Sequence, residues 1–354
     1  MEISIQGQLI GWHHPTYFIA DIAANHDGDL GRAVELIRLA KQAGADAAKF
    51  QNFSAPKIVS DYGFKSLGGR LSHQAEWTKS VVEVYADASI PFEWTPTLKE
   101  ACDEFDIHYF SSPYDYEAID MLDPYVPAYK AGSSLMSWPQ AVVRMAQFGK
   151  PVLIATGDAE MGDVERVMEQ VLPINTEVVL MQCNTNYTAS EGNYDHLHLN
   201  VLKTYAARWP DVVLGLSDHT QSAAPVVGAV ALGARVIERH FTDSNDRRGP
   251  DHKFALNPEN WAHMVQEVRI LERALGSTEK FVAENEKETY IVQRHCLRAA
   301  RPVKAGETFT EDMLEVLRPA TPGSLMAWDL PQVIGKKAAA DLPYGKDLRW
   351  EDLI

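Results

Sequence analysis

Two histidines and two lysines in this chain have surroundings that suit chemistry. His219 and His240 each close a short apolar run, in VVLGLSDHT and ARVIERHFT. Two histidines with nearby carboxylates suit a divalent first-row metal that keeps open positions for a substrate. Lys49 and Lys130 lie inside apolar runs, where an unpaired ammonium would be costly to bury. Such lysines can serve as point charges for phosphate or carboxylate, so we expect a metal site beside a site for a phosphorylated, carboxylated substrate.

Eight short apolar runs, each followed by sequence of helical pattern, must position these residues. They span 17–28, 45–53, 107–113, 128–134, 151–157, 177–187, 212–220 and 234–242. The segment LGRAVELIRLAKQAG after the first run has apolar residues at helical spacing and a stop at Gly44. Alternating strands and helices predict a parallel sheet, and eight such units match the size of a closed (β/α)8 TIM barrel. An open doubly wound sheet is the alternative, but the chain lacks a GxGxxG fingerprint.

The reacting groups of such barrels lie at the carboxyl ends of the strands. Each predicted strand ends in polar residues, so we expect these side chains to converge on one mouth. The candidates are Asp21, Asn25, His26, Lys49, Gln51, Ser111, Ser112, Lys130, Ser133, Ser134, Thr156, Thr185, Asn186, Tyr187, Ser217, Asp218, His219, Glu238 and His240. The segment GPDH adds Asp251 and His252 on the last loop, although Gly-Pro-Asp alone also simply makes a turn.

The sequence changes character after about residue 276. A polar, charged stretch follows, and then short β-like pieces separated by turns and by prolines at 302, 319 and 322. We predict a barrel domain over 1–276, a linker over 277–293 and a small β-rich domain over 294–354.

Composition excludes several classes of partner. The formal charge of −16 disfavours nucleic acid and anionic membranes. No stretch approaches the roughly 18 apolar residues of a membrane helix, and the N-terminus does not resemble a signal peptide. The three cysteines are widely spaced and odd in number, which fits a reducing compartment. We therefore expect a cytoplasmic protein that binds neither nucleic acid nor membrane.

These same segments resemble the sialic acid synthase family, which comprises synthases of N-acetylneuraminate, legionaminate and pseudaminate and the related spore-coat polysaccharide proteins. The likeness runs nearly end to end. It is carried by ADIAANHDGDL (20–30), AAKFQNF (47–53), YFSSPYD (109–115), YKAGSS (129–134), GLSDHT (215–220), VIERHFT (236–242) and GPDH (249–252). The tail, with RPVKAGETFTEDMLEVLRP and IGKKAAADLPYGKDL, resembles the antifreeze-like (SAF) domain of that family.

The resemblance implies a metal-dependent condensation of phosphoenolpyruvate with an N-acyl amino sugar, which gives a sialic-acid-like nonulosonate and phosphate. It also implies a set of roles. His219 and His240 would hold manganese or magnesium; Lys49, Ser112, Lys130, Ser133, Thr185 and Ser217 would bind phosphoenolpyruvate; Asp21, Glu238 and Asp251 would act in catalysis; Tyr187 would line the sugar pocket; and Arg318 would reach into the partner's barrel of a domain-exchanged homodimer.

The chain departs from the usual family residues where the acceptor should sit, so the identity of the sugar stays open. The departures are Asp21, Leu135, Ala155, Thr188 and Ala255, in place of Glu, Glu, Ser, Pro and Ser. Two alternative functions are also consistent with the sequence. One is another barrel aldolase or 3-deoxy sugar phosphate synthase, in which Lys130 could form a Schiff base. The other is a catalytically inactive sugar-binding homologue.

Overall fold

The structure is a computed structural model that describes residues 2–68, 74 and 77–354. The chain divides into two compact units, Met1–Gly276 and Ser277–Ile354. Among the helices of the described ranges, none is long and apolar enough to span a membrane.

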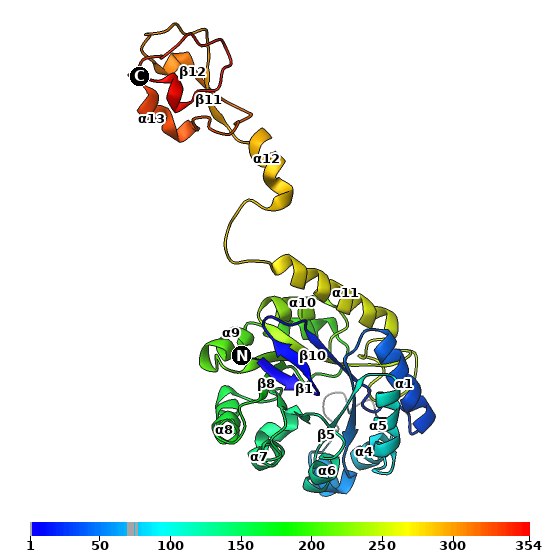
Figure 1. Ribbon diagram of the computed structural model, residues 1–354. Helices are drawn as coiled ribbons and strands as arrows, with labels where there is room; N and C mark the ends of the chain where they lie inside the picture. Colours follow the sequence, from blue (N-terminus) through cyan, green and yellow to red (C-terminus); the bar gives the residue numbers. More distant parts are fainter. Residues whose placement is uncertain (1, 69–73, 75–76) are drawn as a thin grey trace. The chain divides into compact units, whose positions relative to one another are not determined.

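Eight parallel strands form the centre of the first unit (Figure 1). They are β3 (Tyr17–Asp21), β4 (Ala47–Asn52), β5 (His108–Pro113), β6 (Tyr129–Ala131), β7 (Val152–Ala155), β8 (Val178–Cys183), β9 (Val213–Asp218) and β10 (Ala234–His240). Their hydrogen-bonded order is β5-β4-β3-β10-β9-β8-β7-β6. Strands β5 and β6, at the two ends of this order, also contact each other and bring the sheet close to closure. The predicted barrel is confirmed.

Helices surround the strands and cover their outer faces (Figure 1). They are α1 (Leu30–Gln42), α5 (Trp94–Glu104), α6 (Tyr116–Leu122), α7 (Pro139–Ala146), α8 (Met161–Val171), α9 (Val201–Arg208), α10 (Ala224–Ala231) and α11 (Pro258–Leu275). Helix α1 shows why the boundaries are readable in the sequence. The Asp29 side chain accepts a hydrogen bond from the Arg32 backbone at its start, and Gly44, at φ 94°, follows its end.

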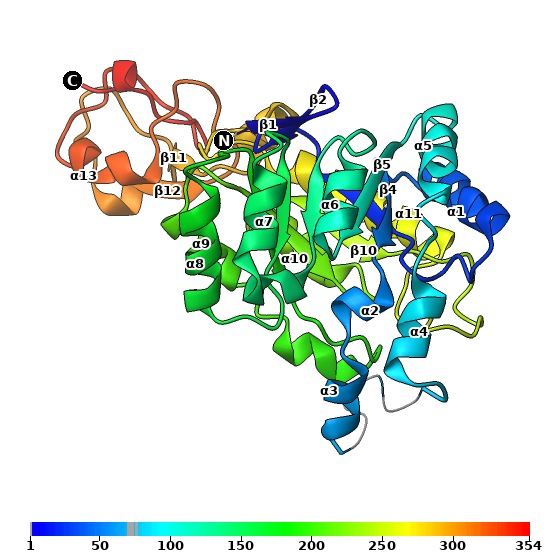
Figure 2. The same ribbon diagram turned by 90° about the horizontal axis from the view of Figure 1, so that it is seen from below.

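The two ends of the barrel differ. At the amino end of the strands lies a hairpin of β1 (Glu2–Ile5) and β2 (Gln8–Gly11), which the sequence analysis did not predict. Ile3, Ile5 and Ile10 are buried with the apolar side chains of the barrel interior. At the opposite end lie the short helices α2 (Ala55–Ile58), α3 (Asp61–Ser66) and α4 (Val81–Ala88), as Figure 2 shows. The hairpin closes one end of the barrel, so a substrate must enter from the other.

The barrel interior is apolar near the hairpin and polar near the mouth. Residues two apart on a strand share a face, so each inward row can be followed along its strand. Ile19 precedes Asp21, and Ala47 precedes Lys49. The buried apolar layer therefore supports a layer of charged side chains directly above it.

The second unit begins with a 3-10 turn, η4 (Glu284–Glu286), and α12 (Lys287–Val292), within the segment predicted to be a linker. The strands β11 (Cys296–Ala299) and β12 (Leu314–Leu317) then pair antiparallel. Isolated bridges such as Val303–Leu342 and the short helix α13 (Leu330–Val333) complete the fold. Leu297, Phe309 and Leu348 are fully buried, so this unit has a core of its own.

Candidate active site

Strand register brings the predicted site residues side by side. On β3, Asp21 lies opposite Lys49 of β4 and opposite His240 of β10. On β10, Glu238 lies opposite Ser217 of β9. Because these strands are parallel and adjacent, groups separated by up to 219 residues, such as Asp21 and His240, meet at one end of the barrel.

Two lysines and two carboxylates form a buried cluster at the mouth. The ammonium of Lys49 lies 2.6 Å from Asp21 Oδ2 and 3.9 Å from Glu238 Oε2, and it donates a hydrogen bond of 3.1 Å to Ser112 Oγ. Lys130 Nζ lies 3.5 Å from Glu238 Oε1, which also accepts a 3.2 Å hydrogen bond from Ser217. Asp21, Lys49, Lys130 and Glu238 are each at most 5% exposed. Charges this deeply buried must be paired, and here the pairing carboxylates belong to the site.

The two lysines have different protonation behaviour. Burial alone would lower the pKa of Lys49, but the Asp21 and Glu238 carboxylates outweigh burial and raise it. The pKa of Lys130 is lowered because burial dominates and Glu238 offsets only part of it. Lys49 is thus a fixed cation, whereas the charge of Lys130 depends on an anionic partner.

The two histidines lie together beside this cluster. The rings of His219 and His240 are 5.4 Å apart between centroids. His219 Nδ1 lies 2.8 Å from the backbone carbonyl of Asn184, and this contact favours a proton on Nδ1 and leaves Nε2 as a ligand atom. Burial, reinforced by the charges of His219 and Lys49, lowers the pKa of His240 well below its ordinary value. A neutral imidazole is the form that binds a metal.

The side chains around the two histidines include several groups that could bind a metal. Across residues 2–68, 74 and 77–354, no group of three or more His, Cys, Asp or Glu side chains is arranged to hold one. His240 Nδ1 and Glu238 Oε2 are buried and, among the described residues, make no hydrogen bond. Asp21 Oδ2 and Asp251 Oδ2 lie 3.6 and 3.8 Å from the two nitrogens of His240. These residues fit a cation held by two imidazoles, with its other positions taken by water or substrate.

Aromatic side chains cover the histidines. The Tyr187 ring lies 4.5 Å from that of His219, and the Phe254 ring lies 4.8 Å from that of His240, measured between centroids. The Tyr187 ring also lies 6.2 Å from that of His240 and 5.4 Å from that of Phe254, so the two aromatic rings form an apolar wall beside both imidazoles that limits water at the site.

Two of the predicted substrate-binding residues meet around Gly157. The backbone amide of Gly157 donates a 3.0 Å hydrogen bond to Ser133 Oγ. A Cβ at Gly157 would lie 2.5 Å from Thr185 Cγ2, 2.9 Å from Ser133 Oγ and 3.1 Å from Cys183 Sγ. Cys183, which the sequence analysis did not select, also contacts His219. Burial lowers the pKa of that histidine, but Cys183, the Asn184 carbonyl and Asp218 together outweigh burial and raise it. The position of Cys183 two residues before Thr185, on the inward row of β8, is the signal that could have identified it.

A second missed residue is Tyr114, which follows β5. Burial raises the pKa of the Tyr114 hydroxyl, and the nearby Lys49 ammonium offsets part of that rise. A Cβ at Gly132 would lie 2.7 Å from the Tyr114 hydroxyl, so the close approach of this ring depends on a glycine.

The loop that carries Asp251 is anchored by charged groups. Asp251 Oδ2 accepts a 3.2 Å hydrogen bond from the Ala24 backbone, and burial raises its pKa to about 6. The neighbouring His252 is fully buried between Thr242 Oγ1 at 2.7 Å and Asp27 Oδ1 at 3.0 Å. These contacts fix the loop beside β3 and hold the Asp251 carboxyl near the histidines.

Two arginines bind the carboxylate of Asp243, which lies on the loop after β10. Arg32 donates two hydrogen bonds of 2.7 Å to the carboxylate of Asp243 and one of 2.8 Å to the Asn25 carbonyl. Arg247 donates to the same carboxylate. The sequence analysis did not select Arg32, Asp243 or Arg247, because nothing in their local sequence shows that they pair.

Comparison with known proteins agrees with this geometry. The model of the NeuB family matches residues 36–280, and that of the SAF domain matches 294–354. The chain belongs to the NeuB family. The expected resemblance is thus confirmed for both the barrel and the tail.

Several relatives match nearly the whole chain. The spore coat polysaccharide biosynthesis protein SpsE of Bacillus subtilis is 30% identical over 99% of this chain and 96% of its own. The N-acetylneuraminate-9-phosphate synthase of Homo sapiens is 31% identical over 94% of this chain and 90% of its own. The pseudaminic acid synthase of Campylobacter jejuni is 31% identical over 95% of this chain and 96% of its own. The crystal structure of Bacillus subtilis SpsE superposes with a TM-score of 0.66 and 28% identity, covering 100% of this chain and 99% of the other.

The positions that depart from the usual NeuB residues lie in and around the mouth. Asp21 contacts Lys49 directly, so its shorter side chain still reaches the cluster. Leu135, Ala155 and Ala255 are buried apolar residues, and each offers no polar group where the family usually has one.

Arg318 lies in the second unit, outside the barrel. Its side chain is exposed and donates a hydrogen bond to Gln293 Oε1. Because the two units are each described by themselves, the role of Arg318 in a partner's barrel stays a prediction.

Proposed function

We propose that this NeuB-family chain is an enzyme that condenses phosphoenolpyruvate with an N-acyl amino sugar, giving a nonulosonate and phosphate. The observation that carries the proposal is the buried cluster of Lys49, Lys130, Asp21 and Glu238 beside His219 and His240. It supplies cations for an anionic substrate and carboxylates for proton transfer within one enclosed space. The names of the relatives support the amino-sugar half of the reaction.

Phosphoenolpyruvate would bind across the lysines. Its phosphate and carboxylate would pair with Lys49 and Lys130, and the hydroxyls of Ser112, Ser133, Thr185 and Ser217 would donate the remaining hydrogen bonds. The substrate's negative charge would also hold Lys130 protonated, since burial otherwise lowers the pKa of that lysine.

The carbon–carbon bond forms between C3 of phosphoenolpyruvate and the aldehyde carbon of the open-chain sugar. A divalent cation, manganese or magnesium, held by His219 and His240 would polarise that aldehyde. Water then adds at C2, and phosphate leaves with its bridging oxygen. Glu238, whose Oε2 is buried and makes no hydrogen bond among the described residues, is placed to accept the proton of this water.

The sugar would lie between the histidines and the outer loop. Tyr187 and Phe254 would pack against its apolar face, and Asp21 and Asp251 would order its hydroxyls. We further propose that Arg318 of a second copy of the chain completes this site in a homodimer, as the resemblance implies.

The test is phosphate release from phosphoenolpyruvate with manganese, across a panel of amino sugars, with and without chelator. Acceptor-dependent and chelator-sensitive release is expected. His240→Ala should abolish it, whereas His263→Ala, an exposed histidine on α11, should leave it intact. Full activity in His240→Ala would contradict the site assignment, and release that needs no acceptor would contradict the reaction.

One observation favours a second function. Lys130 is buried and its pKa is lowered, as in lysines that form Schiff bases. Borohydride trapping with pyruvate should then label the protein, and the label should disappear in Lys130→Met. The absence of labelling would leave the condensation as the reaction of this site.

A further inference from the structure

An ion pair joins strands β9 and β10 where their paired register ends. Asp218 lies opposite Arg239, and the Nε atom of Arg239 lies 3.3 Å from Asp218 Oδ2. Each of the two residues is 1% exposed. His219 and His240 follow Asp218 and Arg239 directly in the sequence. The ion pair therefore stands immediately behind the two histidines of the candidate site.

This ion pair lies on the outer face of the barrel. Ser217 and Glu238 meet inside the mouth through a hydrogen bond, so the next residue of each strand, Asp218 or Arg239, points outward. The Nη1 atom of Arg239 lies 3.7 Å from the sulfur of Met264 on α11. The sequence analysis expected Asp218 at the mouth, and the alternation of β9 turns it away. Neither charged group faces a ligand in the barrel interior.

Arg239 also holds the loop on which His219 lies. Its Nη1 donates a 2.9 Å hydrogen bond to the Ser222 carbonyl. The Asp218 carboxylate accepts hydrogen bonds of 3.1 Å from the Thr220 amide and 3.0 Å from the Thr220 hydroxyl. Residues on both sides of His219 are thus tied to one side chain of the neighbouring strand. These contacts continue the connection between the strands beyond Asp218, the last paired residue of β9.

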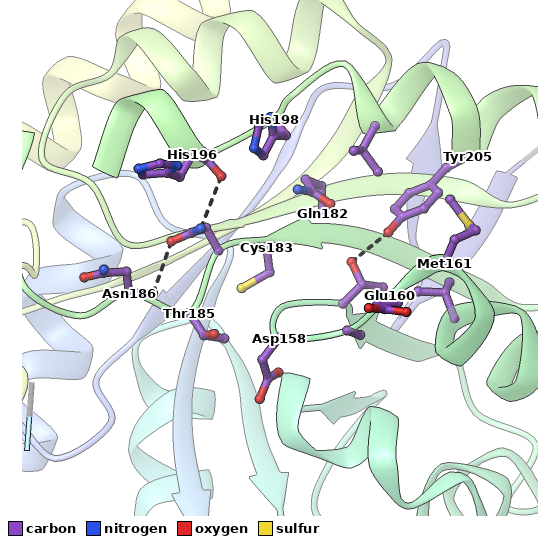
Figure 3. Close-up of a pocket in the computed structure, with 15 residues that line it drawn as sticks. Asp158, Glu160, Met161, Gln182, Cys183, Thr185, Asn186, His196, His198 and Tyr205 are labelled. Atoms are coloured by element: carbon purple, nitrogen blue, oxygen red, sulfur yellow. Dashed lines mark hydrogen bonds between the residues drawn. The ribbon is translucent and has the colours of Figure 1, made fainter. Parts of the chain in front are cut away.

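The imidazole of His219 is fixed from its other side by the loop after β8. Its Nδ1 lies 2.8 Å from the Asn184 carbonyl. The Asn184 side chain donates a 3.2 Å hydrogen bond to the His196 carbonyl and accepts one of 3.2 Å from the Asn186 amide (Figure 3). The Nδ1 of His240, in contrast, makes no hydrogen bond among the described residues. The separation of the two rings therefore depends on how β10 is held against the loop after β9.

A buried ion pair is a costly way to join two strands. The desolvation of two charges can exceed their attraction, so well-packed apolar residues at such positions are often equally stable or more stable. The Nη2 atom of Arg239 is buried and has no hydrogen-bond partner within the described ranges, which adds to the cost. This cost is explained if the contacts of Arg239 serve the histidines beside it.

We propose that Asp218 and Arg239 are positioning residues: their ion pair, with the Ser222 contact, fixes the separation of the His219 and His240 imidazoles and so determines how tightly the site binds a divalent cation. The inference rests on the proposed function, since it takes the two histidines as metal ligands. Groups that orient metal ligands from behind typically change metal affinity by about 10- to 100-fold.

The test is titration of the full, chelator-treated chain with Mn²⁺, without phosphoenolpyruvate or sugar, with free Mn²⁺ measured by electron paramagnetic resonance. Arg239→Met should weaken Mn²⁺ binding by about tenfold or more. This variant leaves the buried Asp218 without its cation and is expected to be unstable. The double variant Asp218→Asn/Arg239→Met removes both charges and keeps an oxygen acceptor for the Thr220 amide. It should unfold in urea near the midpoint of the unaltered chain and still bind Mn²⁺ as weakly as Arg239→Met.

Arg235 provides the matched control. It lies at the opposite end of β10 from His240, is 4% exposed and donates hydrogen bonds to the carbonyls of Val230 and Ala234. Arg235→Met should therefore destabilise the barrel and leave the affinity for Mn²⁺ unchanged. An equal loss of affinity in Arg235→Met would overturn the proposal, as would a double variant that binds Mn²⁺ like the unaltered chain.

A metal-free measurement separates this inference from the proposed function. The imidazole NMR signals of the ¹³C-histidine-labelled chain, assigned with His219→Ala and His240→Ala, report the surroundings of the two rings. They should shift in the double variant, which changes no net charge, and stay in place in Arg235→Met. An unaltered chain that binds no Mn²⁺ would contradict the metal of the proposed function. In that case shifted signals would still support the positioning of the rings, and unshifted signals would overturn it.

Discussion

A single methyl group at Gly157 should disrupt the proposed phosphoenolpyruvate site. The added Cβ of Gly157→Ala would lie 2.5 Å from Thr185 Cγ2, 2.9 Å from Ser133 Oγ and 3.1 Å from Cys183 Sγ. The φ of Gly157 is not in the left-handed region, so the effect comes from contact and not from backbone strain. Overpacking of this kind costs about 1–3 kcal/mol of unfolding free energy.

The effect on activity should be larger than the effect on stability. Relief of the clash must move Ser133 and Thr185, which are two of the proposed substrate ligands. Misplacement by about 1 Å can cost roughly 100-fold in rate, so we expect a fall of this order in kcat/KM for phosphate release.

The matched control is Gly162→Ala in α8, where a new Cβ meets nothing within 4 Å. It should leave activity unchanged and alter stability by no more than about 1 kcal/mol, because alanine favours a helix. Urea denaturation and steady-state phosphate release would measure both quantities. A Gly157→Ala protein with the stability and kcat/KM of the unaltered chain would refute the reasoning.

Three further outcomes are expected. Lys49→Met leaves the Asp21 and Glu238 carboxylates without their cation and should lower the unfolding free energy measured by urea denaturation by about 3–5 kcal/mol. An unchanged denaturation midpoint would show that Lys49 and the two carboxylates do not form a charged cluster. Because burial raises the pKa of Asp251 to about 6, kcat/KM should fall as the pH drops through 6, and Asp251→Asn should remove that step from the pH profile. Above pH 6 the ionised, buried Asp251 lowers the stability of the folded chain. The metal-free Asp251→Asn variant should therefore gain on the order of 2–3 kcal/mol in unfolding free energy at pH 8. Asp243→Asn should lose about 1–2 kcal/mol at pH 7 by thermal denaturation. Since its arginine partners outweigh burial and lower the pKa of Asp243, this difference should shrink progressively as the pH falls below about 4, and a pH-independent difference would argue against the ion pairs.

The sequence by itself determined the barrel and the set of side chains at its mouth. Apolar runs of strand length alternate with helical patterns, and parallel strands end at the same face. Polar residues at the ends of these runs could therefore be selected as site candidates without a structure, and Asp21, Lys49 and Glu238 are among them. The NeuB family model matches residues 36–280, which include seven of the eight strands.

Local sequence did not reveal the N-terminal hairpin. Its strands are only four residues long each, and a turn at Gln6 and Gly7 with positive φ joins them. Strands this short carry little periodic signal, and Ile3, Ile5 and Ile10 become recognisable as core only when the barrel end beneath them exists.

Only the tertiary structure decided which side chains pair. The partners of Lys49 come from three different strands, and the contact between Asp251 and the Ala24 backbone spans 227 residues of sequence. Such distances depend on how neighbouring strands are staggered around the barrel, which no local pattern encodes.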